Sequence, residues 1–394
     1  MSVTYGLVCI SEVLKDFDKS IAFRAMTRKR FNDLSTKESR EFAMNELSER
    51  VLHNTKTTLQ IVKHCSYNKI NHYRVSSKLF PLVTDPTLKI NVDDLKDIEQ
   101  IKKTLSDVGQ AAKDLDVSLS IHPDQFNVLA SERAEVVAKT VIELNFHAWV
   151  LDTMNMPQDY SCPMNVHPST STKEPTDENL KKIVDRFWSG FQKTSDGVKK
   201  RLVVENEDKG CWNCMNLFKY FHIYTRETYD HAFPLTYDNL HNKCNPSEIN
   251  TQKITDEQNV QAFYHTWNTT PVFHWSIGKS DAPNEKRSHA DYLDGDIPEF
   301  NNTDGIPFTI KWECEIKAKD KAIFKILGHE PSIDATWKTT PVVNKKTTNK
   351  KVQPKPETKT KTQAEPQPEQ QTQKESEPTK KNANNPRFNQ IYGR

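Results

Sequence analysis

Glycine is scarce in this chain, with ten among 394 residues. No GxGxxG or GxxxxGK[ST] segment is present, so neither common phosphate-binding loop supports a nucleotide cofactor. Long apolar runs are also missing, and no stretch approaches the length that a membrane-spanning helix needs. The chain shows no cleavable secretion signal. We therefore expect an intracellular protein without a membrane partner, in a compartment that the sequence does not define.

Cysteine use points the same way. The seven cysteines are scattered singly, and an odd number in this arrangement is not typical of a secreted disulfide framework. Cys211 and Cys214 form one CxxC pair. A structural zinc site needs a second pair of ligands, so this pair alone does not predict one.

The C-terminal part contains few large apolar side chains and is rich in Lys, Thr, Gln, Pro and Glu. Such a composition cannot bury enough apolar surface to offset its ordering entropy. We expect a globular domain over residues 1–330 and a disordered basic tail over residues 331–394. From Thr339 to Arg394, twelve Lys and Arg face five Glu, a net charge of +7 that leaves −5 for the remainder. The tail either attracts an anionic polymer in a salt-sensitive way or only aids solubility.

Eight short apolar runs are typical of buried strands, and segments with helical periodicity lie between them. The strand-like runs begin at Val3, Tyr73, Val117, Cys162, Arg201, Phe233, Pro271 and Phe308. The helical segments are residues 41–65, 92–115, 132–154, 176–188, 216–229, 255–267 and 317–327. This alternation favours an α/β fold, a (β/α)₈ TIM-type barrel, over a doubly wound open sheet.

Imidazoles and carboxylates follow these runs from the third strand to the eighth. The set is His122, His167, Glu205, Asp238, His241, His274, His289 and Glu315. In an open sheet such groups collect near one switch point, whereas a closed barrel brings them all to one mouth. A lone histidine at a strand end is usually a hydrogen-bonded surface residue. The joint placement instead predicts a metal site, because buried charge without a partner is costly.

The donor types indicate which metal and which chemistry to expect. Oxygen and nitrogen donors without thiolate suit Mn²⁺, Zn²⁺, Fe²⁺ or Mg²⁺, and the histidines argue against Mg²⁺ alone. About eight donors imply two or three ions. Neighbouring ions polarise a phosphoryl group, generate hydroxide near neutral pH and stabilise both attacking and leaving oxygens, so phosphodiester hydrolysis is the natural reaction.

A set of ordered motifs resembles the UV damage DNA endonuclease family over most of the globular part, from about residue 5 to 327. The motifs are YRVSSKLFP (73–81), IHPDQF (121–126), NVHPS (165–169), LVVENED (202–208), DNLH (238–241), HWS (274–276), HADY (289–292) and ECEIKAKDKA (313–322). Each motif is weak alone, but their shared order and spacing make the resemblance strong.

The resemblance implies a barrel enzyme that acts on double-stranded DNA carrying UV lesions. Family members nick one strand immediately 5′ to a photoproduct, leave 3′-hydroxyl and 5′-phosphate ends, and use a trinuclear manganese site. The same eight residues would be the metal ligands, with Glu205 and Glu315 as the bridging residues. We assign the catalytic role to Glu205, Glu315 and Lys317, and we expect a monomer.

Gln125 and Phe126 stand where the family places its lesion-probing residues. A flat ring can stack where a base has been displaced, and the amide can bond exposed base edges. A loop phenylalanine that caps the barrel is the structural alternative. For Arg74 and Lys319 we expect contacts with phosphates near the scissile bond. Arg74 has an equal alternative, an ion pair with a ligand carboxylate.

The sequence departs from the family at four positions. Phe126 replaces the usual Tyr, and Leu7 and Ser11 stand where the first loop of the family has Tyr and Asn. Val272 stands where some relatives carry a Lys that can be carboxylated near the metals. Without that group, either the metals are held differently or another lysine such as Lys317 assists.

Other functions stay open at this point. An apurinic or apyrimidinic-site endonuclease of the related barrel type and a metal-dependent sugar isomerase would use similar donors. A catalytically inactive protein that binds damaged DNA is a further alternative, but it would need lost ligands, and none of the eight is missing.

Overall fold

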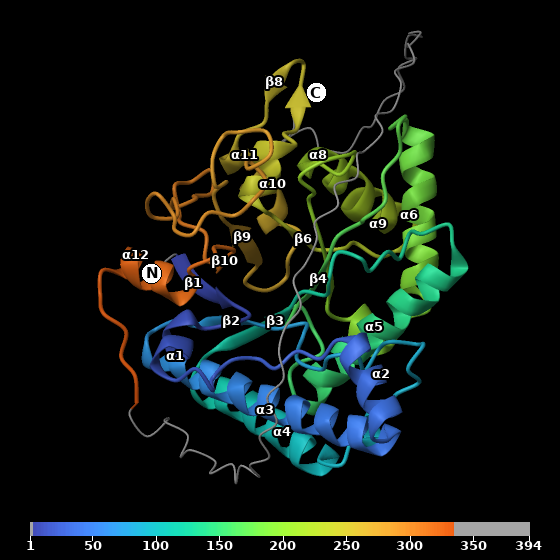
Figure 1. The fold of residues 1–394 in the computed structure, drawn as a ribbon. Helices are drawn as coiled ribbons and strands as arrows, with labels where there is room; N and C mark the ends of the chain where they lie inside the picture. Colours follow the sequence, from blue (N-terminus) through green and yellow to red (C-terminus); the bar gives the residue numbers. More distant parts are fainter. Residues whose placement is uncertain (1–2, 335–394) are drawn as a thin grey trace, which may run out of the picture.

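Eight parallel strands form the centre of the molecule (Figure 1). The structure is a computed structural model that describes residues 3–334, so the predicted tail lies outside the described residues from residue 335 onward. The strands are β1 (Val3–Val8), β2 (His72–Val75), β3 (Ser118–Ile121), β4 (Met164–Val166), β5 (Leu202–Glu205), β6 (Leu235–Thr236), β9 (Val272–Trp275) and β10 (Ile310–Cys314). Their order in the sheet is β6-β5-β4-β3-β2-β1-β10-β9.

The first and last strands of this order, β6 and β9, meet, and their contact closes the sheet into a barrel. Asp238, just after β6, forms an isolated parallel bridge with His274 of β9. The backbone N–H of His274 donates to the carbonyl of Tyr237 at 2.8 Å. Next to the bridge, Asn239 and Ser276 exchange two hydrogen bonds of 2.8 and 2.9 Å. The predicted barrel is confirmed, and two of the predicted metal ligands form its closing bridge.

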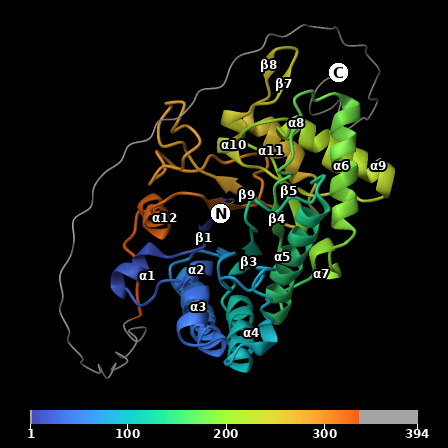
Figure 2. The same ribbon diagram turned by 45° about the vertical axis from the view of Figure 1, so that its right-hand side comes forward.

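Helices surround the strands on the outside, as Figures 1 and 2 show from two directions. They are α1 (Glu12–Phe17), α2 (Arg28–Lys37), α3 (Arg40–Tyr67), η1 (Val92–Asp94), α4 (Ile98–Asp114), α5 (Ala134–Thr153), α6 (Asp177–Phe191), α7 (Asp196–Lys199), α8 (Cys214–Leu217), η2 (Phe218–Tyr224), α9 (Thr225–Tyr229), α10 (Asn239–Cys244), α11 (Asp256–Tyr264) and α12 (Asp320–Leu327). None of the helices in the described part is long and apolar enough to cross a membrane.

All seven segments with helical periodicity contain a helix. The sequence did not predict the hairpin of β7 (Glu248–Ile249) and β8 (Gln252–Lys253), which projects beyond the barrel in both views (Figures 1 and 2). Between β9 and β10 the chain runs through residues 276–309, all of them described, without a helix. His289 therefore lies in a long loop. Its sequence context had suggested the end of a strand, and that prediction is wrong.

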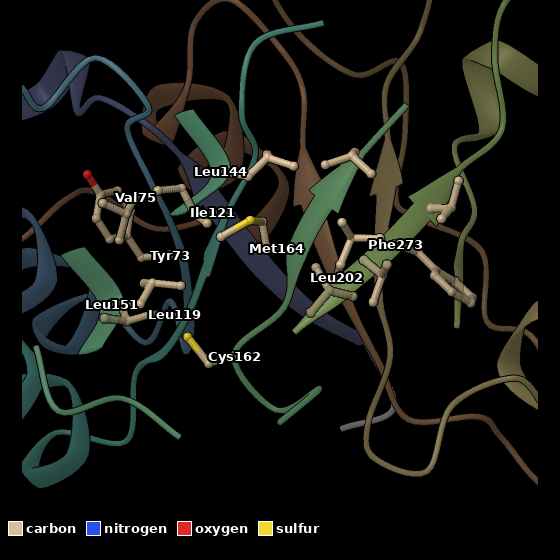
Figure 3. Close-up of a cluster of buried hydrophobic side chains, with 14 of the residues drawn as sticks. Tyr73, Val75, Leu119, Ile121, Leu144, Leu151, Cys162, Met164, Leu202 and Phe273 are labelled. Atoms are coloured by element: carbon tan, nitrogen blue, oxygen red, sulfur yellow. The ribbon is translucent and has the colours of Figure 1, made fainter. Parts of the chain in front are cut away.

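Strand alternation separates the apolar from the polar side chains of the barrel. Tyr73, Leu119, Ile121 and Met164 point outward, where Figure 3 shows them in one cluster with Leu144 of α5. The residues between them face inward and are mostly polar, because successive side chains of a strand point to opposite faces. These inward residues are His72, Arg74, Ser118, Ser120, Asn165, Glu205, His274, Glu313 and Glu315, which contact one another across the barrel. The outward cluster stabilises the barrel, and the inward set forms a polar interior.

Candidate metal centre

Glu205, the last residue of β5, lies at the centre of a cluster of imidazoles and is 1% exposed. Its Oε2 is 3.1 Å from Nε2 of His122 and 3.6 Å from Nε2 of His167. Its Oε1 is 3.1 Å from Nδ1 of His241 and 3.2 Å from Nδ1 of His274. The two oxygens thus face different pairs of histidines, which is the arrangement that a carboxylate spanning two cations requires.

Asp238 and His241 are fixed by the start of α10. Asp238 is the N-cap residue, and its Oδ1 accepts a hydrogen bond of 2.6 Å from the backbone N–H of His241. Asn206 holds both residues, since its Oδ1 accepts from the Asp238 backbone N–H at 2.8 Å and its carbonyl lies 2.8 Å from His241 Nδ1. Capping uses one oxygen of Asp238 and leaves Oδ2 buried without a hydrogen bond.

Glu315 joins the cluster from the end of β10. Its Oε1 lies 3.5 Å from Nδ1 of His274, and its Oε2 lies 3.4 Å from Nε2 of His289 in the long loop. Arg74 is almost fully buried and forms ion pairs with Glu315 and, at 3.0 Å, with Glu313. This geometry fits the alternative in which Arg74 pairs with a ligand carboxylate. Its contact with a DNA phosphate stays a prediction.

The side chains could hold metal ions at three overlapping positions. The groups are His122, His167 and Glu205; His122, His274 and Glu315; and Glu205, Asp238 and His274, with the ligand atoms of each group within 4.8 Å of one another. Several atoms of these residues are buried without a hydrogen-bond partner: His167 Nδ1, Glu205 Oε1, Asp238 Oδ2, His274 Nδ1 and His289 Nδ1. Buried polar atoms are normally satisfied. Both the types of ligand atom and the presence of buried atoms without hydrogen-bond partners fit a metal-dependent enzyme. The metal identity stays a prediction.

The charges of the cluster depend on one another. Burial raises the pKa of the Glu205 carboxyl, but the imidazoles of His167 and His274 outweigh it and hold that pKa well below its ordinary value. Burial also lowers the pKa of His167 to about 3, so this imidazole is neutral and can offer a lone pair. For His274, the carboxylates of Glu205 and Glu315 outweigh burial and raise the pKa well above its ordinary value. Divalent cations bound here would take the place of such protons.

The sequence reasoning missed a second layer of polar residues under the cluster. Glu313 is 1% exposed and contacts His72, Arg74 and His274. Asn165 donates a short hydrogen bond to Glu205 Oε2. A signal for both exists in the sequence, because each stands two positions before a predicted ligand in the same strand segment and must face the same side.

A cavity of about 660 Å³ opens beside this cluster. The predicted ligands His167, His241 and His289 line it together with Gln125 and Phe126. Four further residues that the sequence did not single out also line the cavity: Ser169, Glu207, Lys209 and Arg287. Metal-binding side chains and the predicted lesion probes therefore share one opening.

Comparison with known proteins identifies the family. The sequence model of the family described as UV-endonuclease UvdE matches residues 3–363. The chain belongs to the UV-endonuclease UvdE family. A UV DNA damage endonuclease of Nostoc sp. is 32% identical over 203 residues, which are 52% of this chain and 56% of that protein. A UV DNA damage endonuclease of Bacillus anthracis is 25% identical over 340 residues, covering 84% of this chain and 96% of that protein.

A solved structure supports the same fold. The crystal structure of SacUVDE matches with a TM-score of 0.58 and 22% sequence identity, covering 83% of this chain and 99% of that one. The resemblance seen in the ordered motifs is thereby confirmed, and the chain is an endonuclease of the UvdE type. The roles of its individual residues stay predictions.

Phe126 has no packing role in this UvdE-family protein, since 77% of its surface is exposed. Its loop is fixed by Asp124, whose Oδ1 accepts from the Phe126 backbone N–H at 3.1 Å. Ser169 donates to the Gln125 carbonyl at 3.0 Å and ties the loop to the segment after β4. A phenylalanine that caps the barrel would be buried, so the exposure favours the lesion-probing interpretation.

The two lysines after Glu315 differ in their surroundings. Lys317 is exposed, and its backbone N–H donates to the Ala290 carbonyl at 3.0 Å, which places it beside the loop of His289. Lys319 is partly buried, and burial, with a contribution from Arg74, lowers its pKa. The backbone of Lys319 has a positive φ of 54°, an uncommon conformation for a residue with a side chain. Such strain occurs often at functional sites.

Of the four departures from the family pattern, Phe126 lines the cavity, whereas Leu7, Ser11 and Val272 do not. Leu7 is fully buried in the hydrophobic core. Ser11 is buried as the N-cap of α1, where it accepts from the Leu14 backbone N–H and donates to Asp320. Val272 is buried in β9, two residues before His274. Since two of these side chains are apolar and the third is used in capping, none of the three adds a polar group to the cavity.

We predict that Mn²⁺ stabilises the protein through Glu205. At a free Mn²⁺ concentration of 100 times its dissociation constant, the gain would be about 2.7 kcal/mol per site, because the ion binds the folded state alone. Thermal unfolding with and without Mn²⁺ measures this gain. Glu205→Gln should remove most of it.

The control is Glu143→Gln, which alters a carboxylate beside His147 on α5, with an Oε1–Nε2 distance of 3.3 Å. That variant should keep the full Mn²⁺ effect. An equal Mn²⁺ effect in the Glu205 variant would remove Glu205 from the metal site.

Proposed function

We propose that this protein is a metal-dependent DNA repair endonuclease that nicks the strand immediately 5′ to a UV photoproduct. The substrates would be duplexes with cyclobutane dimers or 6-4 products, and the ends would be 3′-hydroxyl and 5′-phosphate. The protein would act as a monomer with Mn²⁺. The observation that carries the proposal is the shared cavity, in which three predicted metal ligands lie together with an exposed aromatic ring.

The eight predicted ligands would hold the ions. They are His122, His167, Glu205, Asp238, His241, His274, His289 and Glu315, and each takes part in at least one contact with another member of the set. Bound ions would supply an activated water and stabilise the attacking and leaving oxygens. Glu205 and Glu315 are suited to span ions, because each directs its two oxygens toward different imidazoles.

The residues around the cavity would select and orient the damaged strand. Phe126 would stack in the space of a displaced base, while Gln125 would bond an exposed base edge. Damaged steps stack poorly and are extruded at a lower cost than intact ones, which favours lesions over normal DNA. Lys317, Lys319 and Arg74 would contact phosphates and add affinity without sequence preference.

The alternatives receive less support. Family membership favours a nuclease over a sugar isomerase. An inactive binding protein would not need buried metal-ligand atoms that lack hydrogen-bond partners, such as Asp238 Oδ2 and His167 Nδ1. An apurinic or apyrimidinic-site endonuclease shares the chemistry, and the exposed Phe126 beside the metal ligands favours a bulky, distorted lesion.

A duplex with one cyclobutane dimer and a labelled 5′ end tests this function. With Mn²⁺, we expect one labelled product that ends in a 3′-hydroxyl at the nucleotide directly 5′ to the dimer. The same duplex without the dimer should stay intact. Cleavage at an abasic site with the dimer left intact would favour the alternative endonuclease.

Phe126→Ala should reduce the preference for irradiated over unirradiated plasmid by about tenfold or more, because base–aromatic stacking contributes roughly 1–3 kcal/mol. The nicking rate at a saturating enzyme concentration should change less. Tyr67→Ala is a matched control, since Tyr67 is an aromatic residue with 60% exposure at the end of α3, away from the cavity. An unchanged preference in the Phe126 variant would refute its role as a lesion probe.

A further inference from the structure

Glu313 is a fully buried carboxylate for which the proposed function has no use. It lies in β10 directly beside His274 of β9, as the register of the two strands shows. Neither the predicted ligand set nor the groups that could hold a metal ion include it. A buried carboxylate is costly unless several groups neutralise it and bond to it. Its partners therefore indicate what it does.

One oxygen of Glu313 is held from the neighbouring strands. His72 Nε2 lies 3.0 Å from Oε1, and Ser120 donates a short hydrogen bond to the same oxygen. His72 is itself fixed, because its Nδ1 lies 2.8 Å from the hydroxyl of Ser118. Gly6 of β1 leaves space for this ring: a Cβ at Gly6 would lie 2.7 Å from Cδ2 of His72. Two strands and one glycine thus set the orientation of the carboxylate.

The other oxygen of Glu313 faces the cluster. Its Oε2 accepts from Arg74 at 3.0 Å and lies 3.0 Å from Nε2 of His274. Arg74 also pairs with Glu315, so its positive charge compensates both carboxylates, Glu313 and Glu315. The contact with His274 is the link between Glu313 and the candidate metal centre.

The two nitrogens of the His274 ring face different surroundings. Nδ1 lies 3.2 Å from Glu205, 3.5 Å from Glu315 and 3.8 Å from Asp238. Those three carboxylates belong to the predicted ligand set, so Nδ1 is the atom on the metal side. Nε2 points at Glu313 instead. An imidazole that binds a cation through Nδ1 carries its proton on Nε2 and needs an acceptor there.

We propose that Glu313 is a positioning residue that accepts the Nε2 proton of His274 and so directs Nδ1 at the ion shared with Glu205, Asp238 and Glu315. The proposal rests on the proposed role of His274 as a metal ligand. Because Arg74, His72 and Ser120 also bond to Glu313, the carboxylate supports a ligand and is not one itself. Carboxylates behind ligand histidines typically change metal affinity by about 10- to 100-fold.

The test compares Glu313→Gln with a matched control, Asp320→Asn. Asp320 is likewise fully buried, lies 3.1 Å from a histidine nitrogen, that of His64, and accepts a short hydrogen bond from Ser11. It lies at the start of α12. Its hydrogen-bond partners are Ser11, Glu12, Val13 and His64, none of which belongs to the cluster around Glu205. Calorimetric titration with Mn²⁺ should show an affinity about 10- to 100-fold lower for Glu313→Gln. Asp320→Asn should unfold at a lower temperature but bind Mn²⁺ as the wild type does.

A spectroscopic measurement separates positioning from general destabilisation. In the Mg²⁺-loaded protein labelled with ¹⁵N-histidine, His274 should carry its proton on Nε2 alone. In Glu313→Gln, the ¹⁵N shifts should move toward a mixture of tautomers. If Glu313→Gln does not fold, Ser120→Ala, which removes one hydrogen bond to Glu313, should show a smaller loss of Mn²⁺ affinity in the same direction.

The proposal would be overturned if Glu313→Gln and Asp320→Asn both kept an unchanged Mn²⁺ affinity. An equal loss of Mn²⁺ affinity in these two variants would overturn it as well. His274→Ala distinguishes this failure from that of the proposed site. If His274→Ala keeps full Mn²⁺ affinity, the ligand role of His274 is wrong and the role of Glu313 falls with it. If only His274→Ala loses affinity, the site stands and the positioning role alone is wrong.

Discussion

The buried carboxylate of Glu205 and the histidines around it form the interaction on which the site depends. A carboxylate that is 1% exposed would be unfavourable unless positive charge surrounds it. His122, His167, His241 and His274 contact its two oxygens from four different segments of the barrel. The neighbouring carboxylates outweigh burial and raise the pKa of His241 and His274 well above the ordinary value, so these imidazoles balance the charge. Divalent ions bound here would take the place of their protons. The same residues therefore account for the burial of Glu205 and form groups that could hold a metal ion.

The barrel could be predicted because its signals are local. Apolar runs and helical periodicity predicted all eight strands and seven helical segments. The ligand set at the strand ends rests on that arrangement and stays a prediction. His289 was assigned to a strand end although it lies in the loop of residues 276–309, because its place depends on a contact with Glu315 and not on local pattern. The pairing of Arg74 with Glu313 and Glu315 likewise joins β2 to β10, distant in sequence, so the sequence left two roles for Arg74 open.

Strand alternation explains both the site and the departures from the family. Glu313 in β10 and Glu315 directly after it face inward, while the alternate residues pack outside. Leu7 is part of the outer core, and Ser11 caps α1, so neither has a side chain free for the cavity. Val272 adds no polar group below His274, where the carboxylate of Glu313 is the buried charge that contacts the ring.

We infer that Glu205 lies between at least two metal ions when the site is occupied. Anomalous diffraction at the manganese edge, from crystals of the protein grown with Mn²⁺, tests this claim most directly. We expect two or three peaks at the barrel mouth, with one oxygen of Glu205 coordinated to each of two neighbouring peaks. A single peak bound without Glu205, or no peak among the residues of the cluster, would contradict it.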